Sequence, residues 1–121
     1  MDALQAFLGA DLDVKEEVQI KRLGIALEIE AITTKKLQSL TNQATFGKNV
    51  DEIKLNGLIV SAACTNLDFS NPKLLEKYEA VDASDCVQKA LLPGELVNVV
   101  KAVMVASGFD DFEDQVKSAK N

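Results

Sequence analysis

The strongest pattern of hydrophobic positions lies in the last third of the chain, between residues 82 and 109. In its final helix-sized piece, residues 93–107, the polar side chains are Glu95, Asn98, Lys101 and Ser107. At about 100° per residue, one half of the helix is apolar, and Val105 falls on the opposite, polar face. The apolar half consists of Leu96, Val97, Val99, Val100, Val103, Met104 and Ala106. A helix this apolar must be central to a core or give part of its surface to a partner.

Near the N-terminus the period of the pattern is two. Two segments, Glu17–Lys21 and Ile25–Ala31, alternate apolar and polar side chains on either side of Arg22-Leu23-Gly24. This alternation predicts an antiparallel β-hairpin with one buried face. The buried face would be formed by Val18, Ile20, Ile25, Leu27 and Ile29. Because a lone hairpin is marginally stable, we expect helices to cover that face.

Capping residues and helical periodicity predict helices in the rest of the chain. A short helix, Ala3–Leu8, follows the potential cap Asp2 and carries one apolar stripe of Leu4, Phe7 and Leu8. Five later helices are predicted. They are Thr34–Ala44 with the cap Thr33, a helix from the cap Asn49 to about Asn66, Pro72–Tyr78 with the cap Asn71, a helix that begins after the cap Asp82, and a helix from Pro93 to a C-cap at Gly108. Their expected inward residues include Leu37, Leu40, Ile53, Leu55, Leu58, Ile59, Ala62, Ala63, Cys86, Val87, Ala90 and Leu91.

These elements predict an α+β fold that is mostly α. An N-terminal β-hairpin would pack on a bundle of four to five helices, preceded by the short N-terminal helix. A chain of 121 residues is expected to form a single domain, 1–121. Within it we distinguish the N-terminal helix and linker (1–13), the hairpin (17–31), the helical part (33–108) and an acidic tail (109–121).

Composition narrows the class of protein. At 47% hydrophobic and 26% charged residues, the chain has an ordinary globular composition. No apolar run approaches the roughly 20 residues that span a bilayer, and the start lacks a basic region, so we expect a cytosolic protein without membrane contact. The 13 basic and 19 acidic residues give a net charge of −6, which makes nucleic acid a poor partner.

Residues suited to catalysis or metal binding are few. There is no histidine, and the acidic clusters at 11–13 and 110–114 lack the ligand spacing of a calcium loop. Cys64 and Cys86 fall within predicted helices without a CxxC partner and are expected to be buried free thiols. No glycine-rich phosphate loop is present. We therefore expect no catalytic, cofactor-binding or metal site.

Both ends of the chain carry a small apolar stripe: Leu4, Phe7 and Leu8 at one end, Phe109, Phe112 and Val116 at the other. In one interpretation each stripe docks on the chain's own core. In the other, one of them, or the outlying Val105, belongs to a surface that receives an apolar partner helix, since chain ends are readily repositioned. The candidate partner-binding residues are Leu4, Phe7, Leu8, Val105, Phe109 and Phe112. Self-association remains open.

Several segments together resemble one known family, the XkdN-like tail assembly chaperones of tailed phages and prophages in Gram-positive bacteria. They are MDALQAFLGADL, VQIKRLG with LEIEAIT, LNGLIVSAACTNLDFSNPKLLEKYEA and DASDCVQKALLPGELVNVVKAVMVASGF. The resemblance covers nearly the whole chain with the elements in the same order. LLEKYEA, DCVQKALLPGEL and SGFDD are distinctive as a set.

This resemblance implies a non-enzymatic chaperone. Such proteins bind the tape measure protein, a long and largely helical polypeptide that sets tail length. They keep it soluble and extended in the host bacterial cytoplasm until tail tube subunits polymerise around it, and they are absent from the mature virion. The tail tube protein and a longer frameshifted form of the chain are further implied partners.

Two other functions stay open from the residues alone. The break at Leu92-Pro93-Gly94 between two helices could imitate the helix-turn-helix of a small DNA-binding regulator. The scarcity of basic residues argues against it, since Lys89 and Lys101 are the only ones near the break. An uncharacterised enzyme is the third possibility, and its sign would be a pocket lined by convergent carboxylates.

Overall fold

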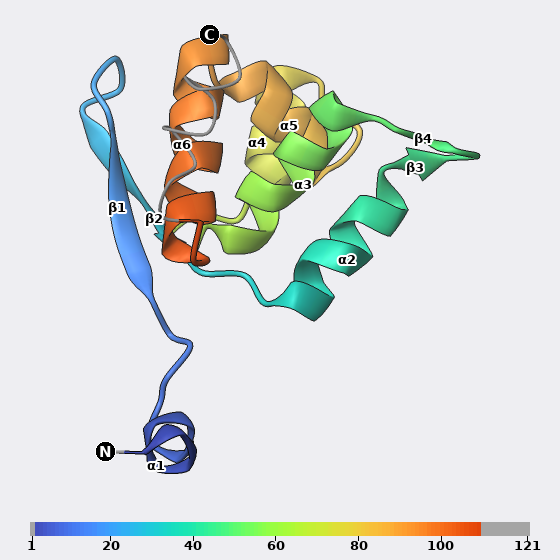
Figure 1. The fold of residues 1–121 in the computed structure, drawn as a ribbon. Coiled ribbons are helices and arrows are strands. Elements are labelled where there is room, and N and C mark those ends of the chain that lie inside the picture. Colours follow the sequence, from blue (N-terminus) through green and yellow to red (C-terminus); the bar gives the residue numbers. More distant parts are fainter. Residues whose placement is uncertain (1, 110–121) are drawn as a thin grey trace, which may run out of the picture.

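Among residues 2–109, an antiparallel hairpin covers α6 of a group of five helices, and a sixth helix, α1, stands apart from them (Figure 1). The computed structural model describes residues 2–109. The predicted fold class, α+β and mostly α with an N-terminal hairpin, is confirmed. The elements are α1 (Ala3–Leu8), β1 (Lys15–Ile20), β2 (Ile25–Glu30), α2 (Thr34–Gln43), β3 (Thr45–Phe46), β4 (Asn49–Val50), α3 (Glu52–Ala63), α4 (Pro72–Tyr78), α5 (Ala83–Ala90) and α6 (Pro93–Ala106).

The predicted antiparallel hairpin is present, but its strands are shifted from the predicted bounds: β1 spans Lys15–Ile20 where Glu17–Lys21 was predicted, and β2 ends at Glu30 and not at Ala31. Val18 pairs with Leu27, and Ile20 pairs with Ile25. Val18, Ile20, Leu27 and Ile29 are buried against the helices. The prediction that Ile25 is buried is wrong: this side chain is 45% exposed because it adjoins the solvent-exposed turn at residues 21–24.

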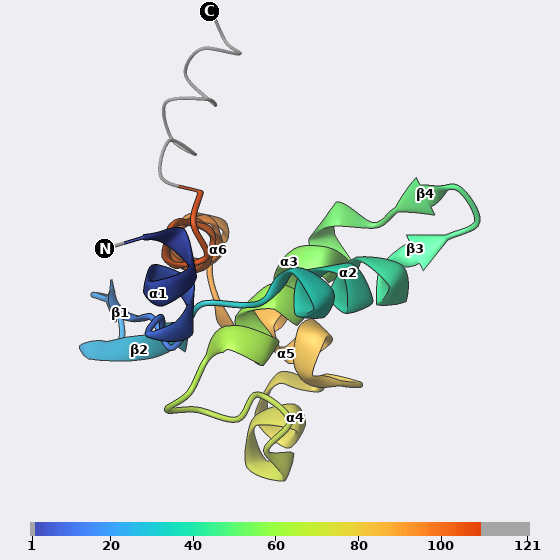
Figure 2. The same cartoon turned by 60° about the horizontal axis from the view of Figure 1, so that its bottom comes forward.

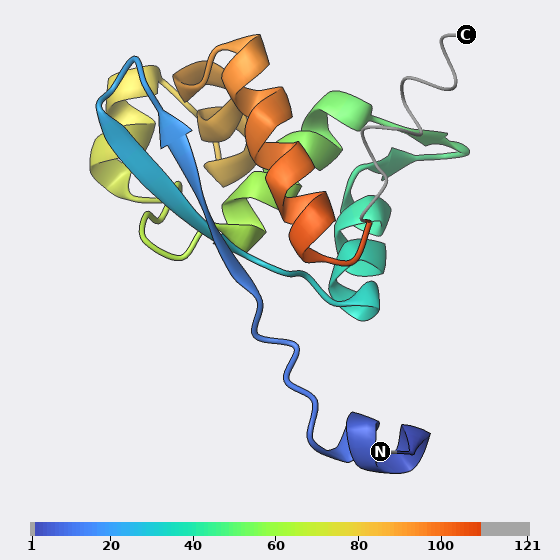
Figure 3. The same ribbon diagram turned by 60° about the vertical axis from the view of Figure 1, so that its left-hand side comes forward.

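The core lies where α6, the hairpin and α3 meet. Helix α6 contacts both β1 and β2 on one side and α3 on another, and Figure 3 shows it between the hairpin and α3. Val99 and Val103 of α6 are fully buried, as are Ile29 and Val60. Residues 93–107, the most apolar stretch of the sequence, are therefore central to the core, which is one of the two interpretations of their pattern.

Not every apolar position of the helices is buried. Val97, which was expected on the inward half of α6, is 61% exposed, and Ile53 in the first turn of α3 is 65% exposed. Each apolar face is wider than the surface that neighbouring elements cover, so its margin stays in solvent. The predictions that Val97 and Ile53 are buried are therefore wrong.

The predicted N-caps are confirmed at four helices. The side chains of Asp2, Thr33, Asn71 and Asp82 each accept a hydrogen bond from a backbone amide in the first turn. Helix α6 ends one residue earlier than predicted, because Ser107 is the C-cap; Gly108 follows it with φ +103°, and the amide of Phe109 donates to the carbonyl of Met104 at 3.0 Å.

The predicted limits of α3 are wrong at both ends. Asn49 belongs to β4, and the cap is Asp51, whose carboxylate accepts from the Lys54 amide at 3.0 Å. The helix ends at Ala63 because Cys64 takes an extended backbone and bridges Ile29 of β2. The small β3–β4 hairpin, which turns at Gly47 with φ +64°, was not predicted at all.

Candidate partner-binding surface

The N-terminal apolar stripe is exposed. Leu4, Phe7 and Leu8 are 67%, 82% and 77% exposed, and α1 contains no buried residue. Figures 1 and 3 show α1 beyond the end of the hairpin, joined to β1 by an extended linker. The stripe does not dock on the described part of the chain's own core, so its three side chains are available to a partner.

The linker that carries α1 forms one wall of an open groove of about 600 Å³. Leu12 and Val14 line one side, and Ile32 and Ala106 line the others. Hydrogen bonds fix the walls: the amide of Ile32 donates to the Ser107 hydroxyl at 3.0 Å, and the amide of Ala31 donates to the carbonyl of Val14 at 2.8 Å. Apolar surface therefore extends from α1 along its linker to the C-terminal end of α6.

The other predicted candidates lie on or just after α6. Val105 is 40% exposed on the outer face of the helix, and Phe109 is also exposed. Val97, Lys101 and Val105 follow one another at intervals of four residues, so they share one stripe of α6. Phe112 lies outside the described residues. The candidates are thus divided between two elements, α1 and α6, which lie apart in Figures 1 and 3 although they overlap in the view of Figure 2.

Sequence reasoning missed several exposed apolar residues. Phe46 lies on the projecting β3–β4 hairpin, where the Lys54 ammonium group lies 5.1 Å from its ring centre. Val81 and Leu92, in the connections that flank α5, are exposed as well. The two-residue strands β3 and β4 are too short to bury the Phe46 ring. No pattern in the sequence predicts strands of that length.

The two cysteines are free, and only Cys86 is buried, while Cys64 is half-buried. The prediction of two buried thiols therefore holds for Cys86 alone. Burial raises the pKa of both thiols, which keeps them protonated and poorly nucleophilic near neutral pH. Across residues 2–109, no group of three or more His, Cys, Asp or Glu side chains is arranged to hold a metal ion.

Three carboxylates lie close together on the hairpin, where Glu16, Glu17 and Glu28 line a shallow groove together with Lys15. Glu17 and Glu28 are directly opposed across the two strands, and neither is buried. An enzyme site would hold such carboxylates in an enclosed pocket where they converge. The groove therefore does not meet the criterion for an enzyme site.

An ion pair supported by further hydrogen bonds joins the hairpin turn to the start of α6. The Arg22 guanidinium donates to both carboxylate oxygens of Glu95, at 2.8 and 3.0 Å, and to the carbonyl of Ala90 at 3.1 Å. The Glu95 carboxylate also accepts from the amide of Leu92 at 2.8 Å. The hydrogen bonds from Arg22 are the main reason that the pKa of Glu95 is lowered.

The junction of α5 and α6 is the place of the turn in the helix-turn-helix alternative. Lys89 donates to the carboxylate of Asp85 at 3.0 Å and to the carbonyl of Glu79 at 2.8 Å. The first turn of α6 carries Glu95 where a recognition helix would contact DNA. The geometry therefore gives no support to a DNA-binding regulator.

These features describe a small α+β protein that offers exposed apolar side chains on a projecting helix and on the rim of its core, which is typical of a protein that acts by contact with other macromolecules. The chain belongs to the family of phage XkdN-like tail assembly chaperone proteins, whose family model matches residues 4–120. The family that the sequence resembles is thus confirmed.

A solved structure has a similar fold. The crystal structure of the protein YqbN is similar with a TM-score of 0.65 and 21% sequence identity over 90% of this chain and 98% of that chain. At this identity the likeness concerns the fold alone. A comparison with curated proteins gave no match. In the part of the chain that the structure describes, no helix combines the length and apolar character needed to cross a membrane.

Proposed function

We propose that the chain binds the tape measure protein and keeps it soluble and extended until the tail tube assembles around it. In this proposal the chain acts in the host bacterial cytoplasm, catalyses no reaction and is absent from the mature virion. Membership of the tail assembly chaperone family supports the general role. The observation that carries the specific role is the exposed apolar stripe of α1 on a segment held away from the core.

The geometry of α1 suits a helical client. Leu4, Phe7 and Leu8 lie at i, i+3 and i+4, so they form one stripe that can pack along the apolar face of another helix. Each Å² of apolar surface removed from water contributes about 25 cal/mol before the cost of ordering the segment. A six-residue helix offers a small area, so we expect contacts that dissociate rapidly. Rapid dissociation is what assembly of the tube around the client requires.

The extended attachment of α1 also has a physical use. A long client presents its apolar stripe in many orientations, and a helix on an extended linker can follow it without moving the core. The net charge of −6 keeps the loaded complexes apart in solution. The tail tube protein and a longer frameshifted form of the chain remain proposed further partners.

Co-expression with a tape measure protein tests the proposal. We expect a larger soluble fraction of the tape measure protein when this chain is present, and co-purification of the two proteins. The matched control is expression of the tape measure protein with an unrelated acidic domain of similar size. An unchanged soluble fraction, or a gain equal to that of the control, would show that the proposed function is wrong.

A further inference from the structure

The two edges of the N-terminal sheet differ. On the β2 side the chain covers its own edge: the amide of Thr65 donates to the carbonyl of Glu28 at 2.8 Å, and the Glu28 amide donates to the side chain of Asn66 at 2.9 Å. The Asn66 side chain also donates to the carbonyl of Ala26 at 3.0 Å. The outward amide and carbonyl of Glu28 and the outward carbonyl of Ala26 are thus satisfied within the chain.

The β1 edge is open. Because Ala26 and Glu28 turn their backbone groups away from β1, the alternation of an antiparallel ladder turns the groups of Lys15, Glu17 and Gln19 away from β2. These three residues are exposed, and the structure of residues 2–109 gives their outward amides and carbonyls no hydrogen-bond partner. Such an edge is a template for a further strand.

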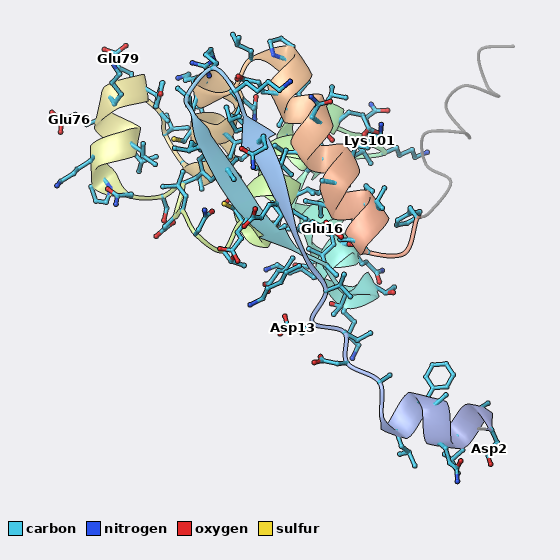
Figure 4. The ribbon with its side chains drawn as sticks, turned by 90° about the vertical axis from the view of Figure 1, so that its left-hand side faces the viewer. Asp2, Asp13, Glu16, Glu76, Glu79 and Lys101 are labelled. Atoms are coloured by element: carbon cyan, nitrogen blue, oxygen red, sulfur yellow. The ribbon has the colours of Figure 1, made fainter. Side chains whose placement is uncertain are left out.

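A shallow groove runs beside this edge. It has a volume of about 380 Å³ and is lined by Glu16 and Glu17 of β1 and by Asn98, Lys101, Ala102 and Val105 of α6. Figure 4 shows β1 alongside α6, with Glu16 and Lys101 labelled. A strand added to β1 would lie about 4.8 Å from it and direct every second side chain toward α6. Those side chains would meet Ala102 and the exposed part of Val105.

The charge of the hairpin's outer face determines which kind of strand can pair with β1. The outer face of the hairpin carries Glu17, Glu28 and Glu30 but one basic residue, Lys15. A second copy paired antiparallel about Glu17 would oppose two like carboxylates, which is destabilising. A strand that alternates basic residues on the outer face with apolar residues toward α6 is complementary on both sides.

We propose that the open edge of β1 binds an extended segment of the client, with alternating basic and apolar residues, as a third strand of the sheet. That this segment belongs to the tape measure protein rests on the proposed function. The site is separate from α1: the helix would capture helical stretches, and the edge would bind an extended stretch through backbone hydrogen bonds.

A capped peptide of alternating Lys and Val, about seven residues long, is the probe. We expect it to bind the full chain and to slow amide hydrogen exchange at Lys15, Glu17 and Gln19, the outward-facing positions. A peptide of alternating Glu and Val is the matched control, and we expect no binding. If the Lys–Val peptide leaves exchange at these amides unchanged, or if both peptides bind equally, the edge proposal is wrong.

A pair of variants separates the backbone from the charge. Glu17→Pro removes the outward amide, which is the position where an edge strand tolerates proline, and Glu17→Ala removes only the carboxylate. We expect Glu17→Pro to bind the peptide about tenfold more weakly than Glu17→Ala. Equal affinity of the two variants would overturn the proposal. Should Glu17→Pro unfold by circular dichroism, the pair Gln19→Pro and Gln19→Ala gives the same comparison.

The client complex then separates this inference from the proposed function. If the tape measure protein co-purifies with the chain while the amides of Lys15, Glu17 and Gln19 exchange as fast as in the free protein, the function stands and the edge is not the site. If the peptide binds at the edge but the tape measure protein does not co-purify, the edge binds strands and the proposed client is wrong.

Discussion

Gly57 is the position where a single hydrogen atom in place of a side chain allows two helices to meet. A Cβ atom at this position of α3 would lie 2.7 Å from the carbonyl oxygen of Ser84 and 3.2 Å from the Gln88 side-chain nitrogen of α5. Ser84 is a buried polar residue of the core, and its hydroxyl donates to the carbonyl of Lys54 at 3.1 Å. The contact therefore involves backbone atoms that cannot easily move.

We predict that Gly57→Ala destabilises the protein. Alanine in a helix gains about 1 kcal/mol over glycine, but overpacking against a rigid backbone costs about 1–3 kcal/mol. We therefore expect a net loss in the free energy of unfolding, measured with urea. Gly94→Ala in α6 is the control, because a Cβ there meets nothing within 4 Å. A Gly57→Ala protein as stable as wild type would show that α3 and α5 can separate without cost.

The Arg22–Glu95 pair predicts a dependence of stability on pH. Hydrogen bonds from Arg22 lower the pKa of Glu95 in the folded protein. Its stabilising contribution is thus present above the ordinary pKa range of a glutamate and is lost as pH falls through the lower, folded value. Between about pH 6 and about pH 3 we expect the free energy of unfolding to fall less steeply for Glu95→Gln than for wild type.

Urea unfolding at several pH values measures this difference. Glu76→Gln on α4 serves as the control, because the structure of residues 2–109 gives that carboxylate no hydrogen bond. An identical pH dependence in wild type and Glu95→Gln would mean that the pair contributes nothing to folding.

Helix α6 combines a buried and an exposed side, and the same substitution distinguishes them. Val103 is fully buried, Val100 is partly buried against the same core, and Val97 is 61% exposed. We predict that Val103→Asp unfolds the protein, because an unpaired carboxylate in the core costs several kcal/mol against a total stability of about 5–15 kcal/mol. Val100→Asp should act in the same direction.

Val97→Asp on the same helix is the matched control and should remain folded. Circular dichroism and thermal unfolding compare the two variants. If Val103→Asp shows a cooperative transition near that of wild type, α6 is not the centre of the core.

The molecule as a whole divides into a packed body and a projecting N-terminal helix, so fold and client capture should be separable. We predict that replacing both Leu4 and Phe7 by serine leaves the fold intact, since both side chains are exposed, and lowers the soluble fraction of a co-expressed tape measure protein. Circular dichroism checks the fold, and co-expression checks capture.

Val81→Ser is the control for this double variant, because Val81 is 84% exposed but lies on the body, between α4 and α5. We expect it to retain full capture. An unfolded double variant would place Leu4 and Phe7 in the core, and unchanged capture would exclude α1 as the binding element.

Much of the fold could be predicted because its signals are local. The caps Asp2, Thr33, Asn71 and Asp82 act on amides within their own first turns, so the starts of four helices follow from neighbouring residues. The buried face of the hairpin follows from the alternation of Val18 and Ile20 with polar residues. Of the candidate site, the apolar stripe of α1 is likewise visible in the spacing of its residues.

Contacts between distant segments settled the rest. Val97 and Val99 are equally apolar in the sequence, and only the position of the hairpin against α6 buries one and exposes the other. Cys64 ends α3 because β2 offers it a backbone partner, and residues 64–66 then cover the β2 edge and leave the β1 edge open. Local propensity identifies the elements of this protein, whereas burial depends on which surfaces meet, and that information is not contained in any short stretch of the chain.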